Sequence, residues 1–237
     1  MPASRLRAAV VCTFAAAGLS ASAHSVLAQQ QAGQAAFRAS PSGIAQARQD
    51  SIRRPYTTAD IEFMSGMIGH HAQAVKMAGW CKSHDASPSL QIFCGRIMTA
   101  QTAEIGLMQQ WLAERNQRVP VADPKGMKMD DMAGMPGMEG MDHGSQYVMM
   151  PGMLTDAQMK RLDEARGVEF DRLFLSFMMQ HHHGAIAMVE KLFGTDGAAQ
   201  DEIVFKFAND VQVDQTTEIN RMQEMLDALP PAPGGGF

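Results

Sequence analysis

Residues 63–77 read FMSGMIGHHAQAVKM, and residues 174–188 read FLSFMMQHHHGAIAM. The two stretches align without a gap. Each begins with phenylalanine, has a methionine three residues before a His-His pair, and ends with methionine. Apolar residues recur at the three- and four-residue spacing of an amphipathic α-helix. The repeated stretch therefore predicts two equivalent helices, each of which carries a pair of histidines.

A second repeat follows the first in each half of the chain. It has the form Gln-x-x-Glu-Ile-x-x-Met and occurs at residues 101–108 and 215–222. The separation in sequence between its two copies is three residues longer than the separation between the two His-His stretches. This difference indicates that the turn between the two helices differs in length between the halves. Each half thus predicts a helical hairpin, at residues 55–117 and 155–229. Two such hairpins packed together give an all-α fold, a four-helix bundle, whose core is a usual place for metal sites.

The N-terminal segment has the layout of a secretory signal peptide. Residues 1–28 hold a basic start, a small apolar run too short to cross a membrane, and small-residue cleavage sites. Residues 29–54 resemble a flexible spacer, and residues 230–237 form a tail. We expect an exported protein without a membrane span, in the periplasm or outside the cell.

Charge and cysteine content narrow the possible partners. Without the leader, 18 basic residues stand against 25 acidic ones. The sequence has no basic patch, which argues against nucleic acid as a partner. Two cysteines remain, Cys81 and Cys94, and an oxidising compartment allows a disulfide between them. Two buried free thiols are the alternative, and the sequence leaves both open.

The linker between the hairpins, residues 118–154, is rich in methionine. It holds nine of the 21 methionines, spaced among Gly, Pro and Asp residues that prevent a stable helix. A flexible spacer is the simpler interpretation, but exposed methionine is apolar and oxidises readily. Capture of Cu(I) or Ag(I) explains the composition better. The candidate ligands here are Met129, Met132, Met135, Met138, Met141 and His143.

The two helical stretches carry the other candidate ligands. On a helix, Met67 shares a face with His70 and His71, and Met178 does the same in the second copy. Thioether favours Cu(I), and imidazole accepts either copper state. Core filling is the alternative for a single methionine. The candidates are Met67, His70, His71 and Met77 in the first copy, and Met178, His181, His182, His183 and Met188 in the second.

Several other polar residues match between the halves or stand alone. Glu104 and Glu218 occupy equivalent positions in the two halves. They could be metal ligands, acceptors that orient the histidines, or surface charges, and the sequence leaves these roles open. Asp60 and Asp171 also match, and their position near a helix start favours capping. His84 lies in an expected turn, where we expect it to be solvated.

Together these motifs resemble a known bacterial family. Phe-Met-x-x-Met-Ile-x-His-His-x-x-Ala-Val-x-Met, followed by Gln-x-x-Glu-Ile-x-x-Met-x-x-Trp-Leu, is similar to the family described as domain of unknown function 305. The resemblance covers about residues 57–115 and 167–229. It implies a ferritin-like bundle, Met and His coordination of copper, and a role in metal tolerance. The third histidine at position 183, and Met225-Leu226 in place of Trp111-Leu112, depart from that pattern.

The sequence favours copper binding over catalysis. Di-iron enzymes of ferritin-like fold need Glu-x-x-His, whereas Met67 and Met178 stand three residues before the histidines here. We expect a protein that sequesters or transfers Cu(I), with Cu(II) or Ag(I) as further ions. A metal-dependent oxidoreductase such as a cuprous oxidase is the alternative, and a purely structural bundle is the third. The expected partners are the metal ion and another copper carrier or exporter, and the oligomeric state stays open.

Overall fold

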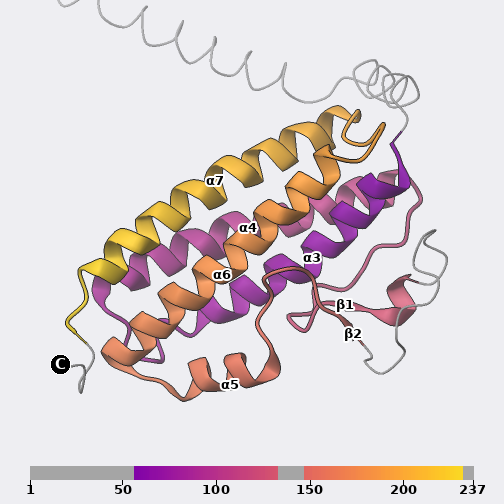
Figure 1. Cartoon of the computed structure of the whole chain (residues 1–237). Coiled ribbons are helices and arrows are strands. Elements are labelled where there is room, and N and C mark those ends of the chain that lie inside the picture. The colour runs from indigo at the N-terminus through magenta and orange to yellow at the C-terminus, as the bar shows by residue number, and fades with distance from the viewer. Residues whose placement is uncertain (1–55, 133–146, 232–237) are drawn as a thin grey trace, which may run out of the picture. The chain divides into compact units, whose positions relative to one another are not determined.

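A computed structural model describes residues 56–132 and 147–231 (Figure 1). These residues form five α-helices, one short 3₁₀ helix and two short strands, so the expectation of a mostly helical protein is confirmed. No helix among them combines the length and apolarity that a membrane span requires. The expected signal peptide and spacer, and the middle of the methionine-rich linker, lie outside the described residues.

Four long helices make up most of the described chain. Helix α3 (Thr58–Gly79) packs against α4 (Pro88–Glu114), and α6 (Gly167–Phe193) packs against α7 (Glu202–Asp227). The first helices of the two pairs, α3 and α6, also pack against each other (Figure 1). This contact brings the two His-His stretches face to face.

The helices begin where local capping chemistry allows. Thr57 accepts a hydrogen bond from the Asp60 backbone N–H, and the Asp60 carboxylate accepts one from the Thr57 backbone in return. Thr155 and Gln158 form the same reciprocal pair at the start of α5 (Asp156–Glu164). Pro88 occupies the first turn of α4. Backbone N–H groups in the first turn have no acceptor within the helix, so a proline there costs no helical hydrogen bond.

Gly167 interrupts the helical segment of the second half. Its φ is +58°, a left-handed conformation that glycine adopts without strain, and it separates α5 from α6. The resulting bend places Asp163 of α5 beside His84, whose Nε2 lies 3.0 Å from the Asp163 carboxylate. His84 is therefore buried, at 4% exposure. The expectation of a solvated His84 was wrong, because α5 covers the turn that carries it.

Cys81 and Cys94 form a disulfide, which resolves the alternative that the sequence left open. Cys81 follows the end of α3, and Cys94 lies in the second turn of α4. Both are 2% exposed. The bond links the two helices of the first hairpin near their connecting turn.

The apolar core consists of two clusters. One includes Met77, Phe170 and Phe174, and the other includes Met67 and Met188. Along α3 and along α6, the His-His pair lies between the residues of one cluster and those of the other. The histidines thus form a polar layer across an otherwise apolar interior.

Each hairpin contacts the connecting turn of the other through an aspartate. Asp60 Oδ1 accepts a hydrogen bond from the Ala199 backbone at 2.7 Å, in the turn before α7. Asp171 accepts one from the Ser87 backbone at 3.1 Å, at the start of α4. The capping role expected for Asp60 is confirmed. Asp171 instead accepts a hydrogen bond at the start of α4, in the other hairpin, and does not cap its own helix.

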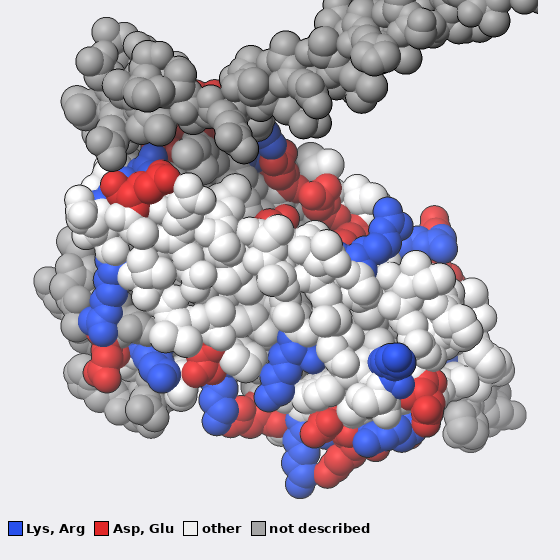
Figure 2. Space-filling model, turned by 180° about the vertical axis from the view of Figure 1, so that it is seen from behind, with Lys and Arg blue, Asp and Glu red and all other residues white. Residues whose placement is uncertain are grey.

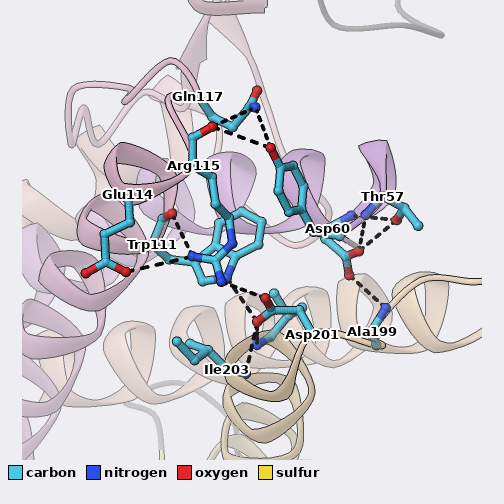
Figure 3. A network of polar contacts seen from close by, with 11 residues as sticks. Thr57, Asp60, Trp111, Glu114, Arg115, Gln117, Ala199, Asp201 and Ile203 are labelled. Atoms are coloured by element: carbon cyan, nitrogen blue, oxygen red, sulfur yellow. Dashed lines mark hydrogen bonds and ion pairs between the residues drawn. The ribbon is translucent and has the colours of Figure 1, made fainter. Parts of the chain in front are cut away.

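A buried ion pair stabilises the end of the structure near Asp60 (Figure 3). The Arg115 guanidinium donates to Asp201 at 2.6 Å and lies 4.3 Å from the Trp111 ring. Asp201 also accepts from Trp111 Nε1 at 3.1 Å and from the first N–H groups of α7. One carboxylate therefore joins the end of α4 to the beginning of α7.

The described ends of the linker are held against α3 and α6. Strand β1 (Met127–Lys128) pairs antiparallel with β2 (Tyr147–Val148). The 3₁₀ helix η1 (Met129–Met132) follows β1. The Gln73 amide of α3 donates to the Leu154 carbonyl at 3.0 Å and accepts from the Leu154 N–H at 2.6 Å. The linker is therefore anchored within one helical turn of the histidines of α3.

Candidate metal centre

Two pairs of histidines meet where α3 contacts α6. His70 and His71 lie on α3, His181 and His182 lie on α6, and all four are buried at 0% exposure. The rings of His70 and His181 have centroids only 3.8 Å apart. The structure thus brings the two repeated pairs together, and we refer to these four residues as the histidine cluster.

Carboxylates from the second helices orient two members of the cluster. His71 Nε2 lies 2.7 Å from Glu104 Oε2, and His182 Nε2 lies 2.7 Å from Glu218 Oε2. A carboxylate only accepts, so Nε2 donates its proton and Nδ1 of the neutral ring carries the free lone pair. Of the roles that the sequence left open for these glutamates, the geometry matches that of acceptors that orient a ligand.

Five nitrogens of the histidine cluster have no hydrogen-bond partner among the described residues. They are Nδ1 of His70, His71 and His182, and both ring nitrogens of His181. Buried polar atoms are nearly always paired, and each unpaired one costs about 1–3 kcal/mol. Each ring in its neutral form has one lone pair, so these nitrogens offer four lone pairs to a cation, and the remaining nitrogen of His181 carries a proton.

Burial keeps His70, His181 and His182 in the form that binds metal. Desolvation lowers the pKa of His70 from 6.5 to about 3, with a smaller contribution from His71. Desolvation likewise lowers the pKa of His181 well below its usual range, and that of His182 to a lesser degree. Neutral imidazole is the ligating form, so near neutral pH little free energy is spent on removing protons before a cation binds.

The linker covers one side of the histidine cluster. His70 Nε2 donates to the Pro151 carbonyl at 3.0 Å. A Cβ placed on Gly184 would lie 1.9 Å from that same carbonyl oxygen, so only glycine allows this approach. A Cβ on Gly69 would similarly lie 2.9 Å from the Gly126 backbone. The Pro151 contact could not be predicted from the sequence. A glycine in mid-helix at position 184 was a usable signal, because glycine there costs about 1 kcal/mol of helix stability.

The opposite side of the cluster opens between α4 and α7. Glu104 and Glu218, each 22% exposed, line a pocket of about 220 Å³ together with Asp214. Burial, followed by the charges of Glu104 and Glu218, raises the pKa of Asp214. Arg96 and Arg221 also line the pocket, so its charge is mixed. The pocket adjoins the histidine cluster through Glu104 and Glu218, which contact His71 and His182.

The methionines of the helical repeats are divided between the two sides of the cluster. Met67 and Met178 are buried at 0% exposure, each one turn before its histidine pair. Met77 and Met178 pack in one apolar cluster, and Met67 and Met188 pack in the other. Among the fully buried methionines, those nearest along the helix to the histidines are thus Met67 and Met178, whereas Met179 is only half-buried.

Some of the predicted ligands lie elsewhere. His183 is exposed on α6, apart from the buried cluster. Met129 is half-buried in η1, and Met132 ends that element. The remaining predicted linker ligands, Met135, Met138, Met141 and His143, lie outside the described residues.

The donor set restricts the kind of ion. Within residues 56–132 and 147–231, no three His, Cys, Asp or Glu side chains are arranged to hold a metal ion. Structural zinc sites use four ligands of these types. Imidazole combined with thioether suits a soft ion such as Cu(I).

The surface gives no sign of a nucleic-acid interface on the face drawn in Figure 2. There the described residues show a broad uncharged area, bordered by side chains of both charge signs. Nucleic-acid-binding faces carry clustered Lys and Arg.

Comparison with known proteins places these features in a family. The family model described as "Domain of unknown function (DUF305)" matches residues 60–226, a span that includes both His-His stretches. A DUF305 structure from Streptomyces coelicolor, described as a candidate secreted protein, is 27% identical. It aligns with a TM-score of 0.57, over 71% of this chain and 92% of its own. No curated protein matches the sequence significantly.

Two further solved proteins share the fold. A DUF305 fragment from Deinococcus radiodurans is 23% identical, with a TM-score of 0.57, over 74% of this chain and 99% of its own. CopM in its Cu(II)-bound form is 25% identical, with a TM-score of 0.51, over 71% of this chain and 95% of its own. CopM has also been solved in a Cu(I)-bound form, at 22% identity. The descriptions of these relatives name the family or copper, and none names an enzyme.

Proposed function

Because the chain belongs to the DUF305 family, we propose that it is an exported copper-binding protein. It sequesters or transfers Cu(I), and Ag(I) by the same chemistry, in metal tolerance or homeostasis. Its fold is then a ferritin-like four-helix bundle of two repeated hairpins, with the metal in the core. The observation that carries the proposal is the set of five unpartnered, buried ring nitrogens.

The ring nitrogens without a hydrogen-bond partner identify the candidate ligands. Glu104 and Glu218 hold two rings so that Nδ1 is available, and the Pro151 carbonyl does the same for His70. Thioethers on the preceding helical turn complete a soft donor set. We assign as candidate ligands the free nitrogens of His70, His71, His181 and His182, and the sulfurs of Met67 and Met178. Because no three His, Cys, Asp or Glu side chains of the described residues are arranged around one ion, each ion takes at most two of these histidines together with thioether sulfur.

The methionine-rich linker is a plausible second place of capture. Its described ends lie against α3 and α6, and its sequence supplies further thioethers. Another copper carrier or an exporter would deliver or accept the ion.

Two features of the chain support export and copper. The expected signal peptide directs secretion, and a disulfide such as Cys81–Cys94 persists in an oxidising compartment. CopM, solved with Cu(I) and with Cu(II), shows that this fold accommodates both copper states in that protein. Imidazole ligands are compatible with either state.

Anaerobic titration of the mature chain with Cu(I), against a competing chelator, tests the proposal. We expect at least one ion per chain to be held against the chelator, because buried neutral imidazoles bind without prior deprotonation. The same sample, returned to air with excess Cu(I), should consume no oxygen beyond the chelator control. Zero stoichiometry would exclude copper binding, and sustained oxygen uptake would favour the cuprous oxidase instead.

A further inference from the structure

A second pocket, separate from the histidine cluster, lies between the start of α3, the end of α6 and the linker. Its volume is about 130 Å³. Three methionines line it, each from a different segment: Met127 in β1, Met150 after β2, and Met188 in α6. Met127 is 2% exposed and Met188 is 8% exposed. Folding thus gathers three thioethers around one space.

Gly66 of α3 makes room for two of these side chains. A Cβ on Gly66 would lie 2.9 Å from the Met150 sulfur and 3.4 Å from the Met188 methyl carbon. The ends of both methionines therefore meet over the same point of the helix. The equivalent residue of the second copy is Phe177, so this arrangement is not duplicated in the other hairpin.

The chemistry of the walls is selective. Thioether is a neutral, soft ligand that favours Cu(I) and does not compete with water for Mg²⁺ or Ca²⁺. The charged side chains that line the pocket are Glu62 and Lys191, which face each other at 4.0 Å. Methionine used only as filler would occupy the space between the elements, whereas here the three side chains surround an opening.

We propose that Met127, Met150 and Met188 form a thioether site for Cu(I) or Ag(I), distinct from the histidine cluster. Met188 lies seven residues after His181 on the same helix, which separates the two sites by about 10 Å along the axis. Met127 and Met150 flank the methionine-rich stretch in sequence. The site rests on the proposed function only for the identity of the ion.

Methionine methyl NMR tests this site directly. The full mature chain is labelled at the methionine ε-carbon, and silver nitrate is added in chloride-free buffer. We expect the methyl signals of Met127, Met150 and Met188 to shift together at one ratio of silver to protein. Each signal is assigned from the spectrum of its single Leu variant. Failure of these three signals to move, at silver concentrations that shift other methionines, would overturn the proposal.

A stoichiometry measurement provides the second readout. The variant M127L/M150L/M188L should bind one silver ion fewer than the wild type, and Met150→Leu alone should weaken that ion measurably. Met149→Leu is the matched control, because Met149 neighbours Met150 but is 46% exposed, and it should leave the count unchanged. Unchanged stoichiometry in the triple variant would contradict the site. Histidine ring signals, recorded on the same samples, report the histidine cluster separately, so that failure of one site is distinguishable from failure of the other.

Discussion

Replacing His181 with leucine should stabilise the metal-free protein while abolishing its tight copper binding. His181 is fully buried, and neither ring nitrogen has a hydrogen-bond partner among the described residues. Removing such a group without leaving a partner unpaired should raise the free energy of unfolding by about 1 kcal/mol. Cu(I) affinity should fall by about 100-fold or more, since even loss of a group behind a ligand costs 10–100-fold.

The opposite signs of these two effects identify a binding residue. Urea denaturation of the metal-free chain measures the first, and anaerobic Cu(I) competition measures the second. His183→Leu is the matched control, because His183 is the next residue but is exposed, and it should change neither quantity appreciably. A His181→Leu protein that is less stable and binds Cu(I) normally would show that this histidine serves packing alone.

Replacing Asp201 with alanine should destabilise the protein by about 3–5 kcal/mol, the usual result of breaking a buried ion pair from one side. The Arg115 and Asp201 side chains are only 7% and 5% exposed. The substitution leaves the buried Arg115 guanidinium with only the more distant, half-exposed Glu114 carboxylate at 3.8 Å, and it leaves Trp111 Nε1 without its acceptor. It also removes the N-cap of α7, which contributes about 1 kcal/mol of that loss.

Urea denaturation again gives the measurement, with Asp210→Ala as the control. Asp210 pairs with Lys206 on the exposed face of the same helix, and such pairs contribute about 0.3–0.5 kcal/mol. Metal affinity at the histidine cluster should be unaffected in both variants, provided the chain is folded. A loss below 1 kcal/mol for Asp201→Ala would mean that water replaces the carboxylate in this network.

The sequence predicted the elements whose signals are local. Helical spacing, the capping pair at Thr155 and Gln158, and the break at Gly167 all depend on nearby residues, and the structure agrees with each. The repeat of the His-His stretch also indicated that the two pairs are equivalent. It could not show that they contact each other, because that depends on how α3 packs against α6.

Contacts that depend on irregular segments, distant in sequence, could not be predicted from the sequence. The Pro151 carbonyl meets His70 across 81 positions of the chain, and no periodic pattern links them. His84 was misjudged for the same reason, since its burial comes from α5, which returns over the turn. Glu104 was recognised as a repeated position, but its contact with His71 depends on the register between two helices.

X-ray absorption at the copper edge, on mature protein loaded anaerobically with one equivalent of Cu(I), tests most directly whether the histidine cluster holds the metal. The free ring nitrogens and the sulfurs of Met67 and Met178 predict a first shell that contains both imidazole nitrogen and sulfur. The outer-ring scattering characteristic of imidazole should decrease in His181→Leu/His182→Leu, because that variant keeps only His70 and His71 as imidazole ligands. A first shell of sulfur alone, identical in wild type and variant, would contradict the account.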